Sequence, residues 1–234
     1  MAGVVKGTGE RAGLGWVGEP IAGAADLMMR VLHGLRTKGM ADVDALAQAA
    51  GLSPEQVAAV LDELGERNWV RYRDGNRAKG WMLLGEGRAE AERLVAAEID
   101  ESGLRPLVQG LYESFRILDP KLKAACTDFQ VKGDQTLNDH SNSEYDAEVI
   151  ARLAEINRRV QPILVQLAEA LDRFGHYGPR LEYALDQVQS GEINWFTKPS
   201  LDSYHEVWFE LHEDLLVTLG IDRAAEEANQ SADV

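Results

Sequence analysis

Two histidines and a tryptophan share one face of a helix that the hydrophobic period predicts over residues 201–219. The side chains at steps of three or four residues along this face are Leu201, His205, Trp208, His212 and Leu215. Histidines seven residues apart are separated by about 10 Å along a helix, too far for both to ligate one metal ion. Their imidazoles could instead line a pocket and hydrogen-bond a polar ligand group beneath the indole. The same pattern also fits histidines packed in a helical core, so both interpretations stay open.

Residues 132–145 are polar and have no hydrophobic period, which predicts a loop. Asp139 and His140 lie near its centre. Long loops in compact domains often carry function, so we predict that these two residues contribute to a ligand site. A solvated connector is the alternative interpretation.

Motifs for metal binding and catalysis are weak or missing. Asp172 and His176, followed by His205 and His212, resemble the Asp/His set of the FCD effector domains of GntR-type regulators. Gly175 predicts that the helix ends before His176, so we predict no metal and no other cofactor. The sequence has no Gly-rich phosphate loop, no His-Glu-x-x-His motif and no nucleophile elbow, and we do not expect an enzyme.

The composition is that of a globular, acidic chain. Of 234 residues, 45% are hydrophobic and 27% are charged, and the formal net charge is −15. This charge excludes a uniformly basic nucleic-acid-binding coat and a polybasic membrane anchor. The single cysteine, Cys126, cannot form an internal disulfide and fits a small buried residue better than a nucleophile. Because no apolar run is long enough to span a membrane, we predict a cytoplasmic protein without a membrane partner.

The charge is divided unevenly along the chain. Residues 25–88 contain nine basic and nine acidic side chains, whereas the remainder contains 15 basic and 30 acidic side chains. The whole net charge therefore lies outside this segment, which predicts two regions with different partners.

The neutral segment has the pattern of three helices and a hairpin. The periods predict helices over residues 24–38, 42–50 and 53–67, strands over 69–73 and 77–84, and a further helix from about residue 87. Ser53 and Gln56 can form a capping box, with Pro54 at the first helical position. Residues 74–76 (Asp-Gly-Asn) are a hairpin turn signal.

This order of elements resembles the winged helix-turn-helix transcriptional regulators, in particular their MarR-like branch. The residues that carry the resemblance are 46–53 (LAQAAGLS), 60–64 (VLDEL) and 81–88 (WMLLGEGR). The resemblance extends over about residues 25–95 and implies a winged-helix domain over residues 25–100. It also implies a homodimer that binds double-stranded DNA.

In such a domain the second helix of the helix-turn-helix enters the major groove, and the hairpin contacts the DNA backbone or the minor groove. The resemblance therefore implies base or phosphate contacts from the start of that helix and phosphate contacts from the basic hairpin. The residues concerned are Ser53, Gln56, Arg71, Arg73, Arg77 and Lys79.

One feature of the same helix is unfavourable for DNA binding. With its hydrophobic residues inward, the helix turns Glu55, Asp62 and Glu66 outward, an acidic surface that phosphate groups repel. A winged-helix protein-interaction adaptor that does not read DNA is therefore the alternative function.

The remaining chain is predicted to be helical over residues 101–220, which makes the protein mainly α. We predict that this all-helical region is the dimerisation or effector domain, between a flexible Gly-rich tail (1–24) and a polar tail (221–234). The periodic helix over 149–174 fits a dimer interface or an ordinary core. The expected function is a dimeric DNA-binding transcriptional regulator in which a small-molecule effector changes the separation of the two winged heads.

Overall fold

The computed structural model describes residues 23–75, 78–133, 135–199, 201–224 and 226. These residues are mainly helical with one two-stranded antiparallel sheet, so the prediction of a mainly α protein is confirmed. Most of the predicted Gly-rich tail, and Arg77 at the hairpin tip, lie outside them. None of the described helices is both long enough and apolar enough to cross a membrane.

Residues 24–84, called the N-terminal unit below, form three helices and a hairpin. Its elements are α1 (Ala24–Lys38), α2 (Val43–Ala50), α3 (Pro54–Glu66), β1 (Val70–Asp74) and β2 (Lys79–Leu83). The hydrophobic residues that the period predicted to be inward form one core shared by all of these elements. Ser53 caps α3 as predicted, and the side chain of Asp42 caps α2.

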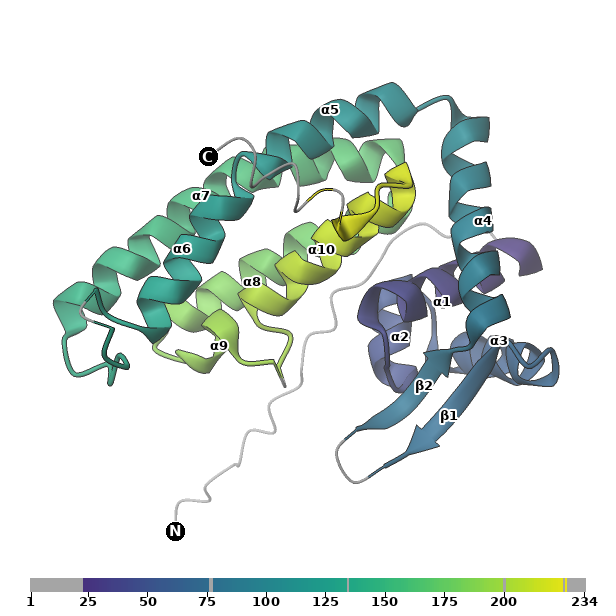
Figure 1. Ribbon diagram of the computed structural model, residues 1–234, viewed down its shortest axis with the longest axis horizontal. Helices are drawn as coiled ribbons and strands as arrows, with labels where there is room; N and C mark the ends of the chain where they lie inside the picture. Colours follow the sequence, from purple (N-terminus) through teal and green to yellow (C-terminus); the bar gives the residue numbers. More distant parts are fainter. Residues whose placement is uncertain (1–22, 76–77, 134, 200, 225, 227–234) are drawn as a thin grey trace, which may run out of the picture.

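The hairpin is anchored to the connection between α1 and α2. Strand β1 pairs with β2 so that Val70 lies opposite Leu83. Ala41 exchanges two backbone hydrogen bonds with Trp81, with N···O distances of 3.1 and 2.7 Å. Gly80 has a φ of +152°, and a Cβ at this position would lie 2.7 Å from the Ala41 carbonyl oxygen, so glycine allows this close approach. The hairpin is held at the middle of β2, and β1 and β2 extend beyond the helices of the N-terminal unit (Figure 1).

Helix α4 (Gly85–Ser102) connects the N-terminal unit to the rest of the chain (Figure 1). Ala91 belongs to the core of the N-terminal unit, whereas Ile99 belongs to the core of the following helices. Gly87 lies against the backbone of Trp69, where a Cβ would be 2.2 Å from the Trp69 carbonyl oxygen. The helix thus passes through the boundary predicted near residue 100 without interruption.

The helical region packs as an elongated bundle with the N-terminal unit at one end (Figure 1). Its elements are α5 (Arg105–Arg116), α6 (Asp119–Gln130), α7 (Ser143–Ala170), the 3-10 helix η1 (Asp172–His176), α8 (Tyr177–Gln189), α9 (Asn194–Thr197) and α10 (Tyr204–Leu219). Helix α7 packs against α5, α6, η1 and α8. Helix α10 packs against α5, α8 and α9, and it also contacts α1 and α4.

Helix α10 begins three residues later than predicted. The Ser203 side chain caps it by accepting a hydrogen bond from Glu206 N at 3.5 Å, so the predicted start at residue 201 was wrong. Leu201 lies in the turn before the helix. The polar stretch between α6 and α7 is a loop as predicted, with a single β-bridge between Val131 and Leu137.

Candidate nucleic-acid interface and buried polar sites

The start of α3 presents the two residues that were predicted to contact bases. Ser53 Oγ accepts a hydrogen bond from Gln56 N at 3.3 Å, and Gln56 Oε1 accepts one from Ser53 N at 2.9 Å. Both residues are exposed. Their side chains are therefore accessible but engaged with each other in the capping box, and a base contact by Gln56 would replace its bond to Ser53.

The hairpin exposes two arginines on one face. Arg71 and Arg73 alternate along β1 and lie opposite Met82 and Gly80 of β2. Within the described part of the chain, neither arginine forms an ion pair. Lys79 is also exposed, with its Nζ 3.2 Å from Asp74 Oδ1.

The outward face of α3 is acidic, as its period predicted. Glu55, Asp62 and Glu66 are all exposed. Glu63, also exposed, accepts a hydrogen bond from Arg67 at 2.6 Å. The hairpin therefore carries exposed positive charge, while the outward face of α3 carries negative charge along its length.

The predicted histidine and tryptophan residues of α10 do not form one open pocket. His205, in the first turn, is 43% exposed with its Nδ1 3.5 Å from Glu206 Oε1. Trp208 is buried, donates from Nε1 to Asp119 Oδ1 at 3.0 Å and stacks on Phe115 with ring centroids 4.6 Å apart. The indole nitrogen is therefore satisfied within the core.

His212 is buried between two carboxylates that the sequence did not connect with it. Its Nε2 lies 3.0 Å from Glu226 Oε1, and its Nδ1 lies 3.8 Å from Asp119 Oδ1. Tyr112 OH donates to the same Glu226 oxygen at 2.6 Å. Glu226 belongs to the segment predicted to be a polar tail, yet it is buried. The only sequence signal for this cluster was the Trp208–His212 stripe, because its partners are far apart along the chain.

The predicted loop residues have a different environment. His140 Nδ1 lies 3.0 Å from Asp146 Oδ2, and the imidazole packs on Phe129 with ring centroids 4.7 Å apart. Asp139 is exposed and accepts hydrogen bonds from Lys132 and Ser141, with the Lys132 bond as the main cause that lowers the pKa of its carboxyl group. These contacts order the loop, and the structure does not bring this loop together with His212 in one site.

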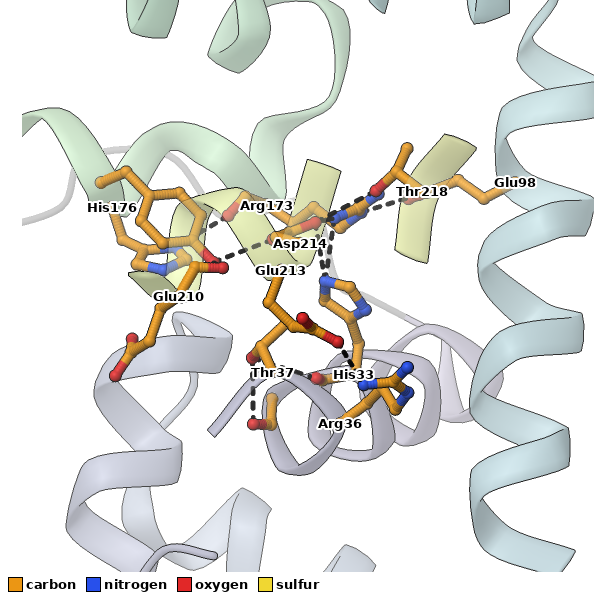
Figure 2. Close-up of polar contacts among 12 residues, drawn as sticks. His33, Arg36, Thr37, Glu98, Arg173, His176, Glu210, Glu213, Asp214 and Thr218 are labelled. Atoms are coloured by element: carbon orange, nitrogen blue, oxygen red, sulfur yellow. Dashed lines mark hydrogen bonds and ion pairs between the residues drawn. The ribbon is translucent and has the colours of Figure 1, made fainter. Parts of the chain in front are cut away.

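A buried polar cluster that the sequence did not reveal joins the N-terminal unit to the helical region. Figure 2 shows Arg173 of η1 at its centre. Arg173 donates to Glu98 of α4 at 2.8 Å and to Thr218 of α10 at 2.6 Å, and it forms a further short hydrogen bond to Asp214 of α10. His33 of α1 completes the cluster, with its Nε2 2.9 Å from Asp214 Oδ1 and 3.0 Å from Arg173 Nη1. Four elements thus meet at one guanidinium group.

The charges in this cluster stabilise each other. Burial by itself would raise the pKa of Asp214, but the nearby Arg173 and His33 outweigh burial and lower that pKa below its usual value. Tyr177 OH also donates to Asp214 at 3.0 Å, and burial followed by the Asp214 charge raises the pKa of this phenol. Asp214 is therefore held as a carboxylate and Tyr177 as a neutral donor.

Further cations of α1 pair with acidic residues of the helical region. Arg36 lies 2.6 Å from Glu213, and Lys38 lies 2.5 Å from Glu210 (atoms Nη1–Oε1 and Nζ–Oε1). Arg30 Nη2 lies 2.7 Å from Asp172 Oδ2. Part of the charge difference between the two regions therefore reflects their attraction to each other rather than different external partners.

Two other findings concern ligands. Asp172 is paired with Arg30 and His176 Nδ1 hydrogen-bonds the Arg173 carbonyl, and the described residues contain no cluster suited to a metal ion. Two adjoining hollows of about 270 and 510 Å³ lie between α7 and α8, and both are lined by Gln161 and Glu182. No residue predicted from the sequence to bind a ligand lines either hollow.

No family model, curated protein or solved structure matches this chain.

Proposed function

We propose that the N-terminal unit is a winged helix-turn-helix and that the protein is a cytoplasmic DNA-binding transcriptional regulator. The order of three helices followed by a hairpin supports this assignment, and so does the short bridge from Ala41 to the second hairpin strand. In this assignment α2 and α3 form the helix-turn-helix, and β1 and β2 form the wing.

The observation that carries the proposal is the contrast between two groups of cations in this unit. Arg30, Arg36 and Lys38 of α1 are paired with carboxylates, whereas Arg71 and Arg73 on the hairpin have no carboxylate partner among the described residues. Two exposed guanidinium groups on one strand face are suited to phosphates of a DNA backbone. Arg77, predicted to contribute as well, lies outside the described residues.

The acidic face of α3 limits how this helix could contact DNA. Even the first turn, which presents Ser53 and Gln56, carries the exposed Glu55, so we expect few direct base contacts. Affinity would come mainly from phosphate contacts of the wing and from other parts of a dimer. The effector or dimerisation role predicted for the helical region is part of the same proposal.

The buried cluster around Arg173 bears on how such a dimer would work. It holds each N-terminal unit against its own helical bundle through contacts to α1, α4 and α10. The separation of two DNA-binding units would then follow the packing of one bundle on the other rather than a hinge within each chain. An effector would act by favouring one bundle arrangement over another.

The proposal is tested by fluorescence anisotropy on DNA from upstream of the gene, over a range of salt concentrations. Arg71→Ala and Arg73→Ala should each weaken binding and reduce the slope of log K against log salt concentration by about 1. The control is Arg158→Ala, which removes an exposed arginine of α7 that is paired with Glu155. Absence of DNA binding by the wild-type protein at low salt, or an equal loss in all three variants, would reject the proposal.

A protein-interaction adaptor is the second candidate, and the acidic face of α3 favours it. Glu55, Asp62 and Glu66 would suit a basic partner surface better than a DNA backbone. An adaptor would not bind DNA even at low salt. Charge-reversal variants of the acidic α3 residues would instead no longer bind the protein partner. The anisotropy experiment above therefore separates the two functions.

A further inference from the structure

Two hydrogen-bonding side chains and a more distant guanidinium group converge on one buried carboxylate of the helical region. Glu226 Oε1 accepts from Tyr112 OH of α5 at 2.6 Å and lies 3.0 Å from His212 Nε2 of α10. Arg116 Nε of α5 lies 3.8 Å from the same oxygen. Glu226 is only 5% exposed, so its carboxylate is enclosed by these groups rather than held at the surface.

The donors are the kinds of group that bind a carboxylate: a phenol, an imidazole N–H and a guanidinium. Burial, followed by the hydrogen bond to Glu226, raises the pKa of Tyr112, so its hydroxyl remains a donor. Both ring nitrogens of His212 face carboxylates, with Nδ1 3.8 Å from Asp119 Oδ1 and Nε2 3.0 Å from Glu226 Oε1.

Aromatic rings form the surroundings of these donors. The His212 ring lies 5.3 Å from Phe115 between centroids, and Phe115 in turn stacks on Trp208. The site therefore combines a polar end for a carboxylate with an aromatic wall.

The donors lie on two helices of the bundle, whereas the carboxylate lies on the segment that follows the last of these helices. Tyr112, Arg116 and His212 lie on α5 and α10, which pack together in the bundle core. Glu226 follows Gly220, which ends α10. If Glu226 moved away, α5 and α10 would still hold Tyr112 and His212 in place, and buried donors without a partner are unfavourable.

We propose that Tyr112, Arg116 and His212 form a binding site for small carboxylic acids, and that Glu226 occupies it as an internal ligand. An external carboxylate competes with Glu226 for the Tyr112 and His212 donors. Because Glu226 is tethered, its effective concentration at the site is of the order of millimolar. An external acid of similar intrinsic affinity must therefore reach a higher concentration than this to displace Glu226. Carboxylic acid binding at this site does not depend on the proposed DNA-binding function. Only the further role of the acid as an effector of DNA binding rests on that function.

The test uses the full chain and acetate as the probe, with sodium chloride at equal ionic strength as the reference. Glu226→Ala removes the internal carboxylate, and Glu226→Gln serves if the alanine variant does not fold. The matched control is Asp128→Ala, which removes an exposed carboxylate paired with Arg152. A double variant, Tyr112→Phe with Glu226→Ala, also removes the hydroxyl that donates to Glu226 at 2.6 Å.

Acetate at about ten times its dissociation constant should raise the melting temperature of Glu226→Ala by about 3–6 °C relative to chloride. The shift should be absent in Asp128→Ala and largely lost in the double variant. Titration calorimetry should then show acetate binding at least about tenfold tighter to Glu226→Ala than to the wild type. No acetate-specific shift, the same shift in every variant, or equal affinity for the wild type and Glu226→Ala would each overturn the proposal. None of these measurements involves DNA, so their failure is distinct from failure of the proposed function.

Discussion

His33 of α1 and Asp214 of α10 lie 2.9 Å apart (Nε2–Oδ1) at a point where both side chains are buried. They are 181 positions apart in the sequence, and each also contacts Arg173. This pair is a direct polar link between the helix that begins the N-terminal unit and the helix that completes the bundle. Together with Arg173 it makes the two units one packed body rather than two independent domains.

We expect Asp214→Asn to lower the free energy of unfolding by about 3 kcal/mol, because it leaves the buried Arg173 without its main counter-charge. Asp172→Asn is the control: this carboxylate also pairs with an arginine, but its side chain is 69% exposed, and its loss should cost less than about 1 kcal/mol. Urea unfolding of both variants measures the difference. Equal losses would show that Asp214 is no more important than a surface ion pair.

The same residue should make stability depend on pH in a defined direction. The pKa of Asp214 is lower in the folded chain than its usual value of 3.8, so its contribution is complete above the unfolded-state pKa and is lost as the pH falls below about 4. The wild-type free energy of unfolding should therefore fall more steeply than that of Asp214→Asn between about pH 5 and pH 2. Unfolding curves over this range measure both slopes. A steeper fall in the variant would mean that the pKa shift has the opposite sign.

The local elements were predictable because their signals are local. The capping box of Ser53 and Gln56 lies within four residues, and the turn signal at 74–76 lies between two alternating strands. The bridge between Ala41 and the second hairpin strand was not predicted, because a single bridging residue has no hydrophobic period. Gly80 was the one available signal, since a glycine inside a strand pattern often marks close backbone approach.

The buried polar clusters could not be predicted for a different physical reason. The spacing of Trp208 and His212 correctly placed them on one face, but spacing is the same for a ligand pocket and for a packed core. Which of the two applies depends on partners such as Tyr112 and Glu226, which only the tertiary fold brings near. Lys38 likewise lies in the last turn of α1, and no local pattern connects it with Glu210 of α10, its ion-pair partner.

Gly87 should be sensitive to substitution because its Cα lies against the backbone of Trp69 at the base of the hairpin. A Cβ at residue 87 would be 2.2 Å from the Trp69 carbonyl oxygen, which accepts a hydrogen bond from Leu84 N at 2.8 Å. We expect Gly87→Ala to lower the free energy of unfolding by about 1–3 kcal/mol. Gly85→Ala, in the same helical turn, has no atom within 4 Å of the added Cβ and should not destabilise the chain. Thermal unfolding of the two variants compares them, and equal stability would mean that the helix shifts to accept the methyl group.

The acidic face of α3 gives the sharpest test of how the N-terminal unit would lie on DNA. In the proposed complex this face approaches the phosphates, so neutralising Asp62 and Glu66 removes a repulsion. The double variant Asp62→Asn with Glu66→Gln should bind DNA several-fold more tightly than the wild type at low salt. The gain should decrease as salt screens the charges. Glu148→Gln, at an exposed position on α7, is the control and should leave the affinity unchanged. If the double variant binds no better than this control in the anisotropy assay, α3 does not face the DNA and only the wing can contact it.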